Sequence, residues 1–276
     1  MRKAAQLTSK FPSQIRLGSI KLFSTQTPSV ELKTKLQGHF HELDFGKCPR
    51  ITLDIQTSES RLFIKTSRLT GFQSRLRTTL GIKRRRGGLD WEVAELLNTI
   101  RAEELQAPTA RLLGFAYRKQ LGLVSNVSLI FEFLEHYLPS HHWLGQKADP
   151  IPFLRNSFML FLKLHEKRIY HLDLWAGNIM IEPCQETLRV IDFENCLHGA
   201  TEHEPEVLGF IYGHFYQREI AQYIDEPTYD RLVDEAISKL PIDPVRFKQI
   251  YTISKHEKVG RKERHLLHSH GLLVTG

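Results

Sequence analysis

Cysteine is scarce in this sequence, and no stretch of it is apolar enough to cross a membrane. The three cysteines, Cys48, Cys184 and Cys196, are odd in number and lack the Cys-x-x-Cys spacing of a redox or zinc motif. No apolar run approaches the roughly 18 residues that a membrane-spanning helix needs. These absences argue against a disulfide framework, a zinc domain and an integral membrane protein, and they favour a reducing cytoplasm.

Acidic residues are missing from two segments that are rich in lysine and arginine. Residues 1–30 contain five basic residues and no Asp or Glu, and residues 60–89 contain nine and again no acid. The chain of 276 residues has a formal charge of +7, so the rest of it is acidic. We expect an anionic partner such as a phosphate group or a phospholipid surface. Solvated faces are the alternative, and nucleic acid is unlikely because the basic segments interleave few stacking aromatics beyond Phe72.

The first 30 residues also lack the continuous apolar centre of a secretory signal. Their Arg, Lys and Ser content is typical either of an organellar transit peptide or of a basic arm at a membrane surface. We therefore assign residues 1–30 to a basic arm, residues 31–134 to an N-terminal lobe and residues 135–276 to a C-terminal lobe.

Strand patterns dominate the first half of the chain and helical patterns the second. Short stretches of strand character lie between residues 36 and 65 and again at 112–134. Between them, residues 89–105 carry apolar side chains at helical spacing. Beyond residue 139 most of the chain reads as helix, apart from short apolar runs near residues 180 and 190. Strands first and helices later predict an α+β protein of two lobes.

One segment, YHLDLWAGNIMI at residues 170–181, places Asp173 and Asn178 five positions apart. It is followed by RVIDFENC, in which Asp192 comes 19 residues after Asp173. Phosphoryl transfer needs a carboxylate that orients the attacking hydroxyl and oxygen ligands that hold Mg²⁺ against the ATP phosphates. Asp173 suits the first task. Asn178 and Asp192 suit the second, because Mg²⁺ takes few protein oxygens and keeps several waters.

These motifs resemble those of protein-kinase-like enzymes, and more narrowly the chain is similar to the lipopolysaccharide kinase (Kdo/WaaP) family, whose members phosphorylate sugars of the lipopolysaccharide inner core. The resemblance covers about residues 36–220. Besides the two motifs above, it rests on LFIK at 62–65, LDWEVAELL at 89–97 and the strand-like stretch that ends in IFEFL. It implies a two-lobed protein-kinase-like fold with a β-rich N-lobe and a mainly helical C-lobe.

The resemblance also implies an ATP site. Lys65 would contact the ATP phosphates, with Glu92 as its partner on the following helix. The residues give independent support, since a lysine in an otherwise apolar strand needs a negative partner. Asp90 and Glu95 are close enough in sequence to remain alternatives to Glu92.

The same resemblance places the hinge between the lobes in IFEFLEH, residues 130–136. Backbone groups of Glu132, Phe133 and Leu134 would face adenine there. This expectation is positional and depends on no other pattern in the chain.

Three features depart from the protein-kinase pattern. No Gly-x-Gly-x-x-Gly loop precedes Lys65, so some other backbone has to cover the phosphates. Trp175 stands two positions after Asp173, where protein kinases have lysine, and Glu194 replaces the glycine of Asp-Phe-Gly. Both replacements point to a small-molecule or glycan kinase, because DLWAGN also resembles fructosamine kinases.

The histidines of the C-terminal segment RKERHLLHSH, residues 261–270, have spacings compatible with metal ligation. We favour instead a solvated basic tail that meets anionic headgroups. His171 is expected to be a structural hydrogen-bonding residue of the catalytic segment.

Taken together, the sequence predicts an ATP- and Mg²⁺-dependent kinase for a sugar hydroxyl of the lipopolysaccharide inner core or a related glycolipid. The basic segment at residues 61–86 would meet the anionic acceptor or the inner face of the membrane. Three alternatives stay open: a fructosamine-like small-molecule kinase, a Ser/Thr protein kinase, and a nucleotide-binding pseudokinase suggested by the missing glycine loop.

Overall fold

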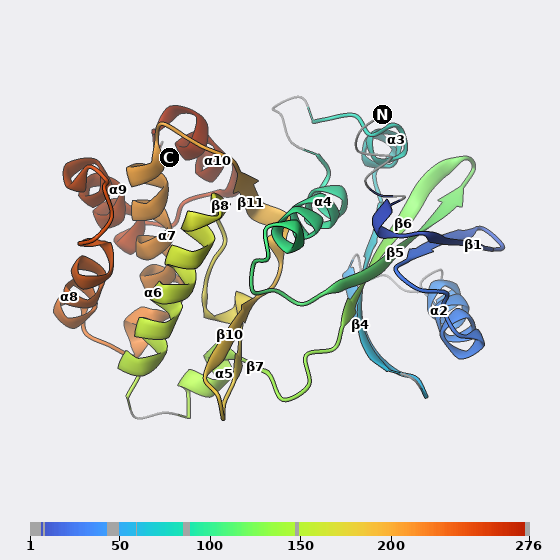
Figure 1. The fold of residues 1–276 in the computed structure, drawn as a ribbon. Coiled ribbons are helices and arrows are strands. Elements are labelled where there is room, and N and C mark those ends of the chain that lie inside the picture. Colours follow the sequence, from blue (N-terminus) through green and yellow to red (C-terminus); the bar gives the residue numbers. More distant parts are fainter. Residues whose placement is uncertain are drawn as a thin grey trace. The chain divides into compact units, whose positions relative to one another are not determined.

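The computed structural model describes residue 7 and residues 9–42, 50–58, 60–84, 89–146 and 149–273. Cys48 and two arginines of the basic segment, Arg85 and Arg86, lie outside these residues. The chain divides into two compact units (Figure 1). The first consists of Met1–Ile100 and Ala110–Leu134, and the second of Arg101–Thr109 and Glu135–Gly276. The first is rich in strands and the second mainly helical, which confirms the predicted α+β class.

The first unit is built on a six-stranded antiparallel sheet. In spatial order the strands are β1 (Ser13–Leu17), β2 (Ile20–Ser24), β5 (Leu112–Gln120), β6 (Leu123–Glu132), β4 (Arg61–Arg68) and β3 (Arg50–Gln56). Its helices are α2 (Val30–Glu42), α3 (Phe72–Leu80) and α4 (Trp91–Glu104), whose last turn is grouped with the second unit.

Two stretches of the first unit differ from the prediction. Residues 13–24, assigned to a basic arm, form the hairpin β1–β2 at one edge of the sheet. Residues 36–42, interpreted as the start of a strand region, belong to helix α2. Leu36 and Phe40 lie one turn apart on that helix and are buried, and this period of four marks an amphipathic helix.

The alternation of side chains along the strands separates two small cores on opposite faces of the sheet. Ile64 and Ile130 pack with α2 residues in one core, whereas Leu129 packs with Leu96 and Ile100 of α4 in the other. Successive residues of a strand point to opposite faces. Lys65, the residue after Ile64, therefore points to the opposite face of the sheet, which α4 covers.

The second unit surrounds one large core in which aromatic side chains predominate. Its helices are α5 (Ser140–Leu144), α6 (Ile151–Glu166), α7 (Glu204–Arg218), α8 (Glu226–Ile237), α9 (Pro244–His256) and α10 (Arg261–His270), with short 3-10 turns η1 (Ala176–Asn178), η2 (Phe193–Asn195) and η3 (Ile220–Gln222). Its strands are β7 (Leu138–Pro139), β8 (Ile169–His171), β9 (Ile179–Glu182), β10 (Thr187–Val190) and β11 (Cys196–His198). Strands β9 and β10 pair antiparallel, as the two apolar runs predict.

Helices α7 and α9 approach each other closely at two glycines. A Cβ atom on Gly209 would lie 2.4 Å from the carbonyl oxygen of Phe247, and one on Gly213 would lie 2.3 Å from Ser254 Oγ. Any larger side chain at these positions would force the helices apart. Among the residues that the structure describes, no helix is long and apolar enough to span a bilayer.

Candidate phosphotransfer site

Lys65 forms a buried ion pair within the first unit. It lies in the middle of β4, opposite Leu129 of β6, and its Nζ is 2.5 Å from Glu95 Oε1. The two side chains are 11% and 5% exposed, so little water competes with the pair. Arg50 Nη2 lies 3.5 Å from the other carboxylate oxygen of Glu95. A lysine anchored in this way has its ammonium group fixed in place.

The carboxylate that forms this ion pair with Lys65 is Glu95, one of the alternatives that the sequence left open beside Glu92. Helix α4 begins at Trp91, which puts Glu92 in its first turn, and Glu95 lies one turn further on, where the helix is buried. Asp90 precedes the helix and forms ion pairs with Arg77 and Arg84. A shift of three residues keeps a side chain on nearly the same helix face, so the sequence pattern could not separate the two glutamates.

The predicted hinge residues Glu132 and Leu134 lie at the end of β6 and just beyond it. The N–H of Glu132 donates to Arg111 O at 2.9 Å, and the N–H of Phe133 donates to Arg61 O at 3.2 Å. The side chain of Glu132 also binds Arg111. Because the sheet uses both N–H groups, an adenine ring facing this segment would have to accept from a different group. Its contact with Glu132 and Leu134 stays a prediction.

In the second unit, the segment with Asp173 and the segment with Asp192 are held together by hydrogen bonds around His171. The N–H of Asp173 donates to His171 Nδ1 at 3.3 Å, and His171 Nε2 lies 3.2 Å from Ile191 O. Burial lowers the pKa of His171, which favours the neutral ring that accepts at one nitrogen and donates at the other. His171 is thus a structural link between the residues beside Asp173 and Asp192.

Asn178 completes this link. Its side-chain Nδ2 donates to the backbone carbonyl of Asp173 at 2.9 Å, and its backbone carbonyl accepts from the N–H of Ile191 at 3.0 Å. Because Nδ2 is engaged, Oδ1 is the side-chain atom left to meet a cation. The backbone of Asp192 is left-handed, with φ 64° and ψ 57°, a conformation that aspartate tolerates better than most residues.

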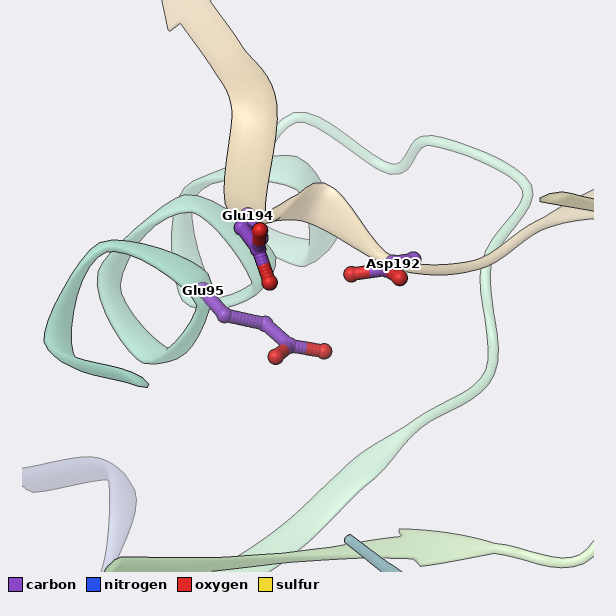
Figure 2. Close-up of side chains that lie close together, drawn as sticks. All are labelled: Glu95, Asp192 and Glu194. Carbon is purple, nitrogen blue, oxygen red and sulfur yellow. The ribbon is translucent and has the colours of Figure 1, made fainter. Parts of the chain in front are cut away.

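The donors in this segment suit a magnesium ion. Asn178 supplies an amide oxygen and Asp192 a carboxylate, and Mg²⁺ prefers such hard oxygen ligands. Figure 2 shows Asp192 and Glu194 on the segment that follows β10, and Glu95 on helix α4. Glu194, which occupies the glycine position of Asp-Phe-Gly, binds Arg261 of α10 at 2.5 Å.

Asp173 has two basic neighbours that no motif in the sequence indicates. Arg264 Nη1 donates to its Oδ1 at 2.7 Å, and His214 Nε2 lies 3.5 Å from the same oxygen. Burial by itself raises the pKa of Asp173, but these two side chains outweigh burial and hold that pKa well below its usual range. Asp173 is therefore ionised at any pH at which the protein would work.

The C-terminal segment is not the solvated basic tail that the sequence favoured. Residues 261–270 form helix α10, whose buried Arg264 and Leu267 lie one turn apart. His265 Nε2 lies 3.1 Å from Asn195 Oδ1, and the carbonyl of His268 accepts from Thr201 Oγ1 at 2.7 Å. The helical spacing of the two buried residues is the sequence signal that could have revealed a packed helix.

Trp175 packs against two basic side chains. The His141 ring stacks at 5.8 Å between ring centroids, and the Arg218 guanidinium lies 4.9 Å from the indole centroid. Gly177 is required below the ring, because a Cβ there would come within 2.3 Å of Trp175. The pKa of His214 is lowered, chiefly because the ring is buried, and the charge of Arg218 lowers it further. Arg218 is thus within electrostatic range of the group beside Asp173.

Comparisons with known proteins give a likeness to a solved structure and no match of sequence. No protein-family model matches the sequence, and no curated protein matches it. A solved structure described as "WaaP in complex with acyl carrier protein" is 15% identical, covers 76% of this chain and 92% of that chain, and has a TM-score of 0.43.

Proposed function

We propose that this protein is an ATP- and Mg²⁺-dependent kinase that phosphorylates a sugar hydroxyl of a lipopolysaccharide-type glycolipid. The observation that carries the proposal is the hydrogen-bond network in which His171 and Asn178 tie Asp173 to the residue before Asp192. The network thereby holds the backbone beside a carboxylate, an amide oxygen and a second carboxylate together within one unit. Phosphoryl transfer needs this combination of groups, and catalysis of it is mostly positioning.

Lys65, fixed by Glu95, would contact the phosphates, and Asn178 and Asp192 would hold Mg²⁺. The bound ion would supply electrostatic neutralisation of the charge that develops on the phosphate during transfer. Backbone groups near Glu132 and Leu134 would face the adenine ring.

Asp173 would orient the acceptor hydroxyl. As the hydroxyl oxygen bonds to the γ-phosphorus, the bond from that phosphorus to the β,γ-bridging oxygen breaks and ADP leaves. The hydroxyl proton passes to Asp173 and then to solvent. Because its pKa is depressed, Asp173 is a weak base, and it would take the proton late, when the oxygen is already bonded to phosphorus and acidic.

The surroundings of Asp173 support a sugar acceptor that carries negative charge. Trp175 replaces the lysine of protein kinases and is packed against His141 and Arg218. A guanidinium held on an aromatic ring suits a phosphate or carboxylate group on the acceptor. The acid-free segment around α3 would meet the anionic inner face of a membrane, where such a glycolipid is available.

Transfer of label from ATP tests this proposal. Purified protein, Mg²⁺ and γ-labelled ATP would be incubated separately with lipopolysaccharide core, fructosamine and a generic protein substrate. We expect label in the glycolipid. Label only in fructosamine or only in protein would replace the proposed acceptor with that one, and ATP binding without transfer to any acceptor or to water would identify a pseudokinase.

Asp192→Ala gives the matched control for the nucleotide site. It should abolish label transfer and weaken Mg²⁺-dependent ATP binding, whereas Asp173→Ala should abolish transfer and leave ATP binding unchanged. If both variants bound ATP with wild-type affinity in the presence of Mg²⁺, Asp192 would not be a metal ligand.

A further inference from the structure

Helix α10 brings a buried arginine to the proposed catalytic carboxylate. The side chain of Arg264 is 8% exposed. Its Nη1 donates to Asp173 Oδ1 at 2.7 Å and to Leu172 O at 3.0 Å, and its Nε donates to Val259 O at 3.0 Å. A guanidinium bound to two backbone carbonyls has a fixed position, so the oxygen that it holds is fixed as well.

The same helix also contacts the segment after Asp192. Arg261 Nη1 lies 2.5 Å from Glu194 Oε1, and His265 Nε2 lies 3.1 Å from Asn195 Oδ1. Together with Arg264, these basic residues lie within five consecutive positions of the helix. Helix α10 therefore braces both segments that carry the proposed catalytic and metal-binding groups.

The two carboxylate oxygens of Asp173 differ in their contacts. Arg264 and His214 both face Oδ1, and no hydrogen bond within the described ranges uses Oδ2. A carboxylate pinned at one oxygen can rotate little about its side-chain torsions, and the other oxygen then points in a constant direction. Oδ2 is thus the atom available to an acceptor hydroxyl.

We propose that Arg264 is a positioning residue, which holds Asp173 by Oδ1 so that Oδ2 is presented to the acceptor hydroxyl. This inference rests on the proposed kinase function. It also accounts for Trp175, because the cation that protein kinases place two positions after the aspartate is supplied here from 91 residues further along the chain. Arg264 does not contact the acceptor and acts only through Asp173.

Two substitutions of Arg264 test the proposal by steady-state kinetics. Arg264→Met should lower kcat by about 10²-fold, the order expected when a catalytic group is misplaced by about 1 Å, with the KM for ATP within about twofold of wild type. Arg264→Lys keeps a cation in the buried site and should recover about tenfold of that loss. The control is Arg155→Met, which removes another arginine–carboxylate pair of this unit, with Glu235, and should leave kcat unchanged.

A double-mutant cycle separates positioning from general structural support. In an Asp173→Asn background, Arg264→Met should change the residual rate by less than about twofold, because the group that it positions is already inactive. A full 10²-fold further loss in that background would overturn the proposal. So would a kcat for Arg264→Lys and Arg264→Met equal to that of wild type.

Thermal unfolding keeps the test independent of activity. The Tm loss of the double variant Asp173→Asn, Arg264→Met should be smaller than the summed losses of the single variants, since both remove one contact. Equal sums would overturn the contact itself. Absence of label transfer by wild-type protein to any acceptor would instead overturn the proposed function, while the unfolding cycle would still report on the pair.

Discussion

Helices α3 and α10 each contain two arginines, and the sequence predicts that both segments meet anionic partners. In the structure, much of their charge is used inside the chain. Arg77 of α3 and the nearby Arg84 bind Asp90, whose side chain is 1% exposed. Arg264 of α10 binds Asp173 in the proposed catalytic segment. The two helices thus form ion pairs with different acidic residues: α3 with the structural Asp90, and α10 with Asp173, which is proposed to be catalytic.

The difference between the helices lies in what else each one presents to solvent. Helix α3 has no buried residue, and Phe72 and Leu80 at its two ends are 68% and 61% exposed. Helix α10 buries Arg264 and Leu267. A count of charges could not have distinguished the two, because burial depends on contacts with distant parts of the chain. Phe72 and Leu80 of α3 are more exposed than Leu266 of α10, which is 39% exposed, so the combination of cations and exposed apolar side chains that suits a membrane surface is stronger in α3.

The largest expected effect is on the acid that α10 serves. Asp173→Asn should lower the rate of phosphoryl transfer by roughly 10²–10⁴, the usual contribution of a positioned acid–base group, while the protein stays folded. Label transfer and circular dichroism would be measured on the same samples. Transfer within about tenfold of the wild-type rate would contradict the assignment of Asp173.

Replacing Asp90, the ion-pair partner of α3, should lower stability and leave turnover unchanged. Asp90→Asn leaves two arginines beside a neutral amide, and the loss of a buried ion-pair partner should lower the free energy of unfolding by about 3 kcal/mol. Urea unfolding measures this change. The turnover per folded molecule should be retained, and a large loss of turnover with unchanged stability would show that the two acids do not differ as described.

A third prediction concerns a buried basic group that lacks an acid. Both ring nitrogens of His198 are buried without a hydrogen-bond partner among the residues that the structure describes. Burial, and then the charge of Arg101, lowers the pKa of His198 from 6.5 to about 4. Between these pH values the unfolded chain binds a proton that the folded chain excludes, so stability falls as the pH drops from 6.5 to 4.

This acid-induced loss should be about 2 kcal/mol from His198, given a pKa shift of two to three units and partial solvent screening. His198→Leu should remove that part of the loss. The measurement is urea unfolding of both proteins at several pH values in this window. Parallel pH dependences for wild type and variant would show that His198 is protonated equally in both states.

The smallest expected effect is on membrane binding. Lys83, which follows α3, is exposed, and Lys83→Ala should weaken binding to vesicles that contain acidic lipid by about fivefold, or about 1 kcal/mol per cation. Lys239, exposed near the end of α8, provides the matched control, and its replacement by Ala should leave vesicle binding unchanged. Binding that ignored both salt and lipid charge would refute a membrane role for α3.

The local part of the candidate site could be predicted from the sequence. Asp173, Asn178 and Asp192 lie within twenty residues, and the apolar runs between them pair as β9 and β10. Contacts of this kind depend on spacing and on the alternation of strand residues, which the sequence displays directly. The α+β class follows in the same way from the order of strand and helix patterns.

Other parts depended on information that spacing does not contain. The choice of Glu95 over Glu92 depends on where α4 begins and on which of its faces meets the sheet. Arg264 reaches Asp173 through a packing contact over 91 residues. Hairpin β1–β2 carries alternating apolar residues around Gly18, which has a φ of 61°, but its basic charge concealed that strand pattern.

The close packing of α7 against α9 has a consequence for the tolerance of the protein to core substitutions. Gly213, where the helices nearly touch, immediately precedes His214, the residue beside Asp173. A methyl group at position 213 would push the two helix backbones apart and carry His214 with them. If Asp173 acts as proposed, a change from Gly213 to Ala should therefore slow transfer, although it adds a single carbon and replaces none of the proposed catalytic groups.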